Sequence, residues 1–166
     1  MARLTTTLII ATALLATAAC SKKRPETLPP APGEQTSGPT TTDNVVPGSR
    51  ADFERSVTSN TVNFALDRYD IDARAREILD SQVAWLAKWP NVPVSLEGHA
   101  DERGTREYNL ALGDRRANAA KNYLAGRGVN PARISTISYG KERPIALGSD
   151  EASWAQNRRA VTIVLN

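Results

Sequence analysis

From about Phe53 onward, strand-like and helix-like patterns alternate along the chain, and this alternation limits the possible folds more than any other feature. Polar and apolar residues alternate over Thr61–Leu66, and apolar residues then recur at helical spacing over Ala73–Trp89, with Asp72 placed to cap that helix. A second, longer helix is predicted at Thr105–Ala125 and ends at Gly126 or Gly128. Further strands are predicted at Val92–Gly98, Arg133–Gly140 and Arg158–Leu165, and residues 141–157 are expected to form a loop with one short helical turn.

The element order strand–helix–strand–helix–strand–strand (βαβαββ) predicts an α/β (α+β) two-layer sandwich. Its helices should cover one face of a small, mixed four-stranded sheet. A strand–helix–strand crossover places its two strands parallel. The segments that follow the first two strands, "LDRYD" and "GHADERG", are therefore expected at the same edge of the sheet. Open sheets of this kind tend to bind ligands at that edge.

The first 52 residues lack this alternation and divide into two segments. Residues 1–19 contain a short apolar run, Leu8–Ala16, which suits a cleaved signal peptide and is too short to span a bilayer. Residues 20–52 are rich in Pro, Gly, Ser and Thr, and this composition predicts a disordered tether. The folded domain is then expected over residues 53–166.

Cys20, the only cysteine, lies where signal cleavage is expected, at the end of "TAAC". This arrangement resembles a bacterial lipoprotein signal, in which the cysteine is lipidated and becomes the mature N-terminus. The alternative is an ordinary secretory signal with an unrelated cysteine. We favour lipidation, because an unpaired exposed cysteine is a liability in an oxidising compartment.

Composition excludes several classes of function. The formal net charge of +3 comes without an extended basic run, so no nucleic-acid partner is predicted. One cysteine and one histidine exclude a disulfide framework and the usual zinc clusters, and we expect no metal and no cofactor. No P-loop, G-x-S-x-G sequence or motif-placed nucleophile occurs, and the chain is predicted not to be an enzyme.

Two adjacent arginines in the second predicted helix differ in their expected environments. Arg116 falls on the same helical arc as Leu112 and Ala117, whereas Arg115 points toward water. A buried guanidinium cannot lose its proton, so it needs an anion of matching geometry, and Asp101 is the nearest candidate. Periodicity leaves two arrangements open. The two side chains either form a closed salt bridge that braces the loop, or stay partly unpaired so that a zwitterion docks between them.

Two long segments, "GHADERGTREYNLALGDRRANAAKNYL" and "ISYGKERPIALGSDEASWAQNRRAV", resemble the OmpA-like peptidoglycan-binding family. The similarity covers most of Val62–Leu165. Where the wider family usually has "GHTD" and "LS", this chain has "GHAD" and "LG", as in the branch of peptidoglycan-associated lipoproteins (Pal). The resemblance implies an OmpA-like fold and a non-enzymatic protein that binds peptidoglycan through the diaminopimelate of its stem peptide.

The same resemblance implies roles for individual residues. Asp101 would accept hydrogen bonds from the ammonium group of diaminopimelate, and Arg116 would bind its carboxylate. The other expected members of the site are Asn109, Leu112, Leu66, Asp67 and Tyr69. His99 is expected to bond loop backbone or to border the ligand. Arg158 and Arg159 are expected to be mainly structural, with a place in the lining of the site as the alternative for Arg158.

The resemblance further implies a location and partners. A lipid on Cys20 would hold the protein in the outer membrane, facing the periplasm, within the Tol–Pal system of envelope integrity and cell division. Its partners would be peptidoglycan, TolB and other Tol proteins. Two alternatives stay open: a peptidoglycan amidase or endopeptidase, and a protein-binding adaptor in which the Asp101–Arg116 pair is structural.

Overall fold

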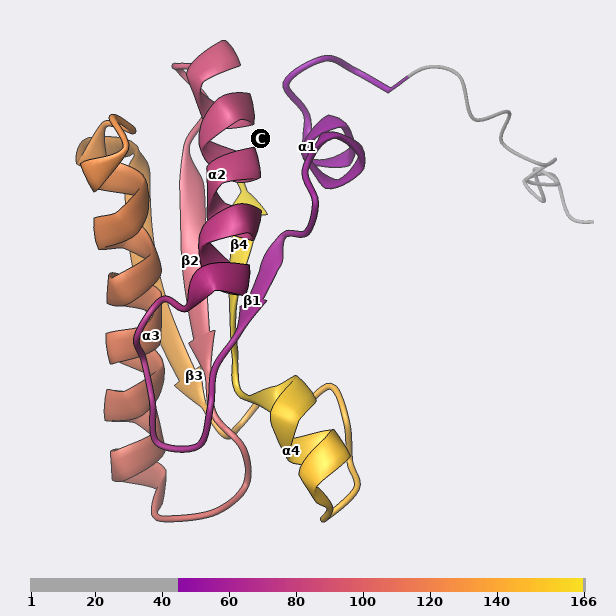
Figure 1. The fold of residues 1–166 in the computed structure, drawn as a ribbon, viewed down its shortest axis with the longest axis vertical. Coiled ribbons are helices and arrows are strands. Elements are labelled where there is room, and N and C mark those ends of the chain that lie inside the picture. The colour runs from indigo at the N-terminus through magenta and orange to yellow at the C-terminus, as the bar shows by residue number, and fades with distance from the viewer. Residues whose placement is uncertain (1–44, 166) are drawn as a thin grey trace, which may run out of the picture. The chain divides into compact units, whose positions relative to one another are not determined.

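The computed structural model describes residues 45–165, and within them four strands form one mixed sheet in the order β1-β4-β2-β3 (Figure 1). The predicted signal peptide, Cys20 and the tether up to residue 44 lie outside the described residues. The strands are β1 (Thr61–Asn63), β2 (Val94–His99), β3 (Ile134–Gly140) and β4 (Arg159–Val164). β2 and β3 are parallel neighbours, and β4 runs antiparallel to both β1 and β2.

β1 and β2 therefore run in the same direction, although β4 lies between them. Their carboxyl ends open at the same edge of the sheet, which confirms the edge predicted from the crossover. β1 is shorter than expected. The amide of Phe64 still donates to the carbonyl of Arg158, but the chain then turns through Asp67, whose φ of 53° is left-handed.

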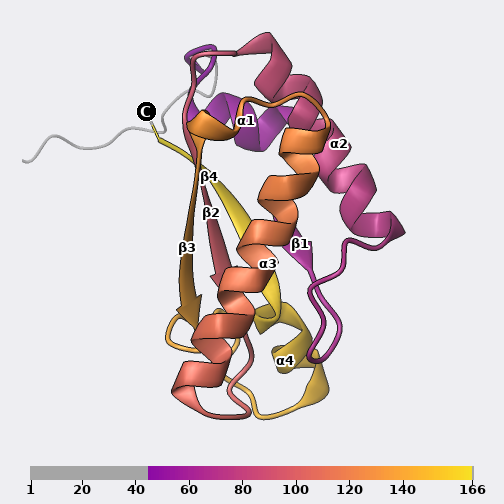
Figure 2. The same cartoon turned by 90° about the vertical axis from the view of Figure 1, so that its left-hand side faces the viewer.

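Two helices form the second layer. α2 (Ala73–Lys88) and α3 (Arg106–Gly126) lie on the same face of the sheet (Figures 1 and 2). The side chain of Asp72 accepts from the amide of Ala75, so the predicted cap of α2 is confirmed. The buried core between the layers includes Val62, Leu79, Leu86, Leu96, Ala117, Leu124 and Val164.

The backbones of α3 and β2 approach each other closely at two glycines. A Cβ atom on Gly98 would lie 1.8 Å from the carbonyl oxygen of Gly113. A Cβ atom on Gly113 would lie 2.8 Å from the carbonyl oxygen of Gly98. The absence of both side chains lets the first half of α3 rest directly on the end of β2, beside the edge where the carboxyl ends of β1 and β2 lie.

Three short helices complete the described part of the chain: α1 (Arg50–Ser56), η1 (Pro131–Arg133) and α4 (Glu151–Asn157). α4 replaces the single turn predicted within residues 141–157, and Asp150 caps it. α1 was not predicted and extends across the expected domain boundary at residue 53. Its Phe53 is fully buried and meets the ring of Trp85 edge-on, with 5.0 Å between ring centroids.

The two ends of the sheet carry different elements. α1 lies at the end where β1 begins, and α4 lies at the opposite end with the loops that follow β1 and β2 (Figure 1). None of the helices within residues 45–165 has the length and hydropathy needed to cross a membrane.

Candidate functional site

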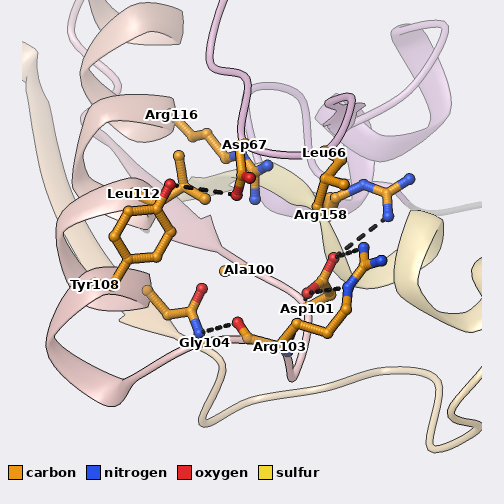
Figure 3. A pocket seen from close by; sticks show the side chains of 11 residues that line it. Leu66, Asp67, Ala100, Asp101, Arg103, Gly104, Tyr108, Leu112, Arg116 and Arg158 are labelled. Atoms are coloured by element: carbon orange, nitrogen blue, oxygen red, sulfur yellow. Dashed lines mark hydrogen bonds and ion pairs between the residues drawn. The ribbon is translucent and has the colours of Figure 1, made fainter.

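A pocket of about 300 Å³ lies where the loops after β1 and β2 meet the first turns of α3 (Figure 3). Its walls come from three stretches of chain that are far apart in sequence. The lining residues are Leu66, Asp67, Ala100, Asp101, Arg103, Gly104, Tyr108, Asn109, Leu112, Arg116 and Arg158. The pocket brings together six of the eight ligand-binding residues expected from the sequence.

Arg116 lies at the back of this pocket, and its side chain is completely buried. Its Nε donates to the carbonyl oxygen of Arg68 (2.9 Å), Nη1 to that of His99 (2.8 Å) and Nη2 to that of Ala65 (3.1 Å). The guanidinium thus joins the loops after β1 and β2. All three acceptors are neutral, and two of its five N–H groups have no hydrogen-bond acceptor among residues 45–165.

The charge of Arg116 is only partly compensated. Burial lowers the pKa of the guanidinium to about 10, against the opposing effect of the Asp101 carboxylate, and the group remains charged at neutral pH. No carboxylate is hydrogen-bonded to it in the described part of the chain. A buried cation that lines a cavity and keeps two N–H groups without acceptors is suited to bind an anion that accepts two parallel hydrogen bonds, such as a carboxylate.

Asp101 is also buried, at 4% exposure, but its hydrogen-bonding capacity is filled. Arg103 donates to it through its backbone N–H (3.1 Å), Nε (3.2 Å) and Nη2 (2.6 Å). Arg158 donates through Nη1 at 3.3 Å. Burial alone would raise the pKa of Asp101, but the hydrogen bonds from Arg103 and Arg158 hold it below its ordinary value.

Two expectations about this pair are therefore wrong. Asp101 and Arg116 do not form a direct salt bridge, and Asp101 is not left partly unpaired. The physical reason is local, because the side chain of Arg103 folds back onto a carboxylate only two residues away. Arg116 alone matches the expectation of a charge left without its counterion.

The remaining walls combine apolar and polar groups. Asn109 is buried and donates through Nδ2 to the carbonyl oxygen of Arg103 at 2.8 Å, which ties α3 to the loop after β2. Leu112 is buried and Leu66 is half-exposed, so they give the pocket an apolar floor and rim. Beside Leu112, the hydroxyl of Tyr108 donates to Oδ1 of Asp67 at 3.3 Å (Figure 3).

Tyr69 and His99 lie outside this pocket. Tyr69 instead lines a neighbouring hollow with Asp67, Arg68 and Asp70. Side chains alternate along β2, so His99 points to the face of the sheet away from α3, where its ring lies 5.5 Å from that of Tyr139. It contributes to the site only the carbonyl oxygen that accepts from Arg116.

The imidazole of His99 is 2% exposed, and neither ring nitrogen has a hydrogen-bond partner among residues 45–165. A carboxylate oxygen of Glu97 lies 3.9 Å from Nε2. Burial lowers the pKa of His99 to about 4, and the nearby guanidinium groups of Arg159 and Arg143 act in the same direction. The expected hydrogen bond from the ring to loop backbone is therefore wrong, and the ring is neutral at physiological pH.

This environment predicts a pH-dependent stability. In the unfolded chain His99 binds a proton below about pH 6.5, whereas the folded domain excludes that proton down to about pH 4. Stability should therefore be complete above pH 6.5 and fall as the pH is lowered, by about 2 kcal/mol at pH 5 and about 3 kcal/mol at pH 4. Urea unfolding between pH 7 and pH 4 measures how steeply the free energy of unfolding falls with pH, and His99→Phe should make this dependence shallower. An identical slope in both proteins would contradict the assignment.

The sequence did not point to Arg103 or Tyr108. For Arg158 it favoured a mainly structural role, and the pocket shows the alternative, a place in the lining. One signal for Arg103 exists. Asp in a loop commonly accepts from the backbone N–H two residues ahead, and Asp101 makes that contact with Arg103. Nothing in residues 45–165 forms a cluster of His, Cys, Asp or Glu that could hold a metal ion.

Comparison with known proteins gives a consistent result. Residues 63–158 match the model of the OmpA family. The chain is 55% identical over 118 residues to the peptidoglycan-associated lipoprotein of Rhizobium meliloti, covering 71% of this chain and 66% of that protein. It is 46% identical over 156 residues to the protein of the same name from Agrobacterium fabrum, covering 94% and 85% of the two chains. Its fold is similar to the crystal structure of the peptidoglycan-associated lipoprotein from Burkholderia pseudomallei, with a TM-score of 0.65, 41% identity, and coverage of 69% of this chain and all of that one.

Proposed function

The chain belongs to the OmpA family, and on this premise we propose that it is a lipoprotein that binds peptidoglycan noncovalently through the diaminopimelate of the stem peptide. One observation carries the proposal. Arg116 is a buried guanidinium that lines an open pocket, is held in place by three carbonyl oxygens and is hydrogen-bonded to no carboxylate within residues 45–165. The names of its relatives, peptidoglycan-associated lipoproteins, support the choice of ligand.

The chemistry of the pocket suits one end of diaminopimelate, which carries an ammonium and a carboxylate on the same carbon. The two remaining N–H groups of Arg116 would bind the carboxylate. The exposed carboxylate of Asp67 would receive the ammonium, and Asp101 would do so once one of its present donors moves aside. Leu66 and Leu112 would contact the methylene chain. A volume of about 300 Å³ accommodates a group of amino-acid size. The rest of the stem peptide would extend out of the pocket past Tyr69.

The decisive experiment measures retention of the full chain, in detergent, on purified sacculi. We expect retention that is competed by a stem tripeptide ending in meso-diaminopimelate. The matched tripeptide ending in lysine, which lacks the distal carboxylate, should compete far less, because Arg116 would then have no anion. Equal competition by both peptides, or no retention at all, would refute the proposal.

The same incubation tests whether the protein is an enzyme. We propose that it is not one, because the pocket contains no Ser or Cys nucleophile and its lining includes no histidine side chain. Soluble muropeptides should stay at the level of a protein-free control. Their release in proportion to added protein would favour an amidase or endopeptidase.

We also propose a lipid anchor at Cys20 and a tether from there to the start of α1 at Arg50, which together hold the domain at the outer membrane, on its periplasmic side. Within this proposal the protein acts in the Tol–Pal system, with TolB and other Tol proteins as partners, in envelope integrity and cell division. The Cys20→Ala variant should move from the membrane fraction to the soluble periplasmic fraction. A variant that still sediments with membranes would show that another segment provides the attachment.

A further inference from the structure

We infer that the guanidinium of Arg103 competes with the ligand for Asp101. It is bound to the Asp101 carboxylate until the ammonium group of a zwitterionic ligand displaces it. This competition limits the affinity of the pocket for a zwitterion. This inference rests on the proposed function and adds a specificity-determining residue to the same pocket.

The carboxylate of Asp101 is already occupied by donors of the protein itself. Four hydrogen bonds reach its two oxygens, and the side chain of Arg103 provides two of them. The two arginine side chains on this carboxylate differ in exposure, since Arg103 is 34% exposed and Arg158 is 7% exposed. A ligand approaching Asp101 from solvent therefore meets the guanidinium of Arg103 first (Figure 3).

The lining of the pocket carries an excess of positive charge. Three arginines, Arg103, Arg116 and Arg158, face two aspartates, Asp67 and Asp101, so the lining carries a net charge of +1. With Arg103 seated on Asp101, the pocket favours the carboxylate of a zwitterion and repels its ammonium. Moving Arg103 away from Asp101 removes this repulsion of the ammonium.

Arg103 has other partners beside it when its guanidinium leaves Asp101. Its guanidinium carbon lies 4.0 Å from the ring centroid of Trp154, and its Nη1 lies 3.8 Å from Oε2 of Glu151. Both residues belong to α4. Arg158, by contrast, is held by the carbonyl oxygen of Phe64 (3.0 Å) and by Oε1 of Glu151 (2.7 Å). Arg158 would therefore stay in place and keep Asp101 ionised.

The experiment compares two stem tripeptides by isothermal titration with the full chain. One ends in meso-diaminopimelate and the other in 2-aminopimelate, which keeps the distal carboxylate and lacks the distal ammonium. Arg103→Ala should bind the diaminopimelate peptide about 3- to 10-fold more tightly than the wild type does, as expected when a partly exposed ion pair no longer competes. The 2-aminopimelate peptide should bind Arg103→Ala no more tightly than it binds the wild type.

Two control variants accompany this measurement. Arg103→Lys keeps a cation beside Asp101 and should stay close to the wild type. Arg106→Ala removes an exposed arginine of the same region that pairs with Glu142, and it should change neither affinity. Thermal unfolding monitored by circular dichroism establishes that each variant is folded. If Arg103→Ala does not fold, Arg103→Gln takes its place.

Fluorescence of Trp154 gives an independent readout. Diaminopimelate should change the emission of the wild type as Arg103 shifts against this ring, and Trp154→Phe should abolish the change. If Arg103→Ala weakens binding of both peptides, Arg103 is itself an anion ligand and the inference is wrong; unchanged binding of both peptides also overturns it. Failure of the proposed function appears separately, as a wild-type protein that binds neither peptide or an Arg116→Ala variant that binds both normally.

Discussion

Gly98→Ala is expected to unfold the domain, or to leave it so unstable that it is not folded at 37 °C. The added Cβ atom would lie 1.8 Å from the carbonyl oxygen of Gly113 and 2.5 Å from its carbonyl carbon. Both atoms belong to the backbone of α3, so no side-chain rotation can relieve the contact, and the helix must separate from β2. We expect a loss of more than about 4 kcal/mol, which is comparable to the whole stability of many small domains.

Chemical unfolding followed by circular dichroism measures this loss, with Gly126→Ala as the matched control. Gly126 ends the same helix, and a Cβ atom there would meet nothing within 4 Å. The control should be neutral or more stable by about 0.5–1 kcal/mol, as alanine usually is relative to glycine in a helix. A Gly98→Ala domain within about 1 kcal/mol of the wild type would show that α3 and β2 do not pack as described.

Arg116→Ala is expected to abolish retention on sacculi and to destabilise the domain. Without the guanidinium, the proposed carboxylate ligand loses its fork-shaped partner, and affinity should fall at least 100-fold. The carbonyl oxygens of Ala65, Arg68 and His99 also lose their donors, and the loops after β1 and β2 lose the group that joins them. The accompanying loss of stability should be about 2–4 kcal/mol.

The adjacent Arg115 provides the control for this prediction, because its side chain is exposed and does not line the pocket. Arg115→Ala should keep its stability and its retention within about twofold of the wild type. Retention is measured well below the unfolding temperature of both variants, so that a folded Arg116→Ala is compared with a folded Arg115→Ala. Equal retention by the two variants would show that Arg116 does not contribute to ligand binding.

The features that could be predicted from sequence are those set by periodicity and local capping. Helical spacing alone distinguishes the buried Arg116 from the exposed Arg115, and Asp72 caps α2 as expected. The crossover rule places the ends of β1 and β2 at one edge, although it does not place β4 between them. Antiparallel pairing across long sequence separations depends on the whole fold, and no local pattern encodes it.

The features that could not be predicted depend on side-chain directions in loops. The choice of Arg103, rather than Arg116, as the partner of Asp101 follows from how the chain turns after β2. His99 is an error of a different kind. It lies between Gly98, which faces α3, and Ala100, which lines the pocket, so strand alternation already indicates that its ring points to the opposite face.

The position of α1 has a mechanical consequence for the proposed attachment. α1 and the start of β1 lie at one end of the sheet, and the loops after β1 and β2 lie at the other (Figure 1). Residues of these two loops line the pocket. Tension between a membrane anchor and a wall fragment would therefore pass lengthwise through the domain. The hydrogen bonds between β1 and β4 would be sheared along the strands rather than peeled apart one after another, and Phe53, wedged against Trp85, would be the first buried contact to resist the pull.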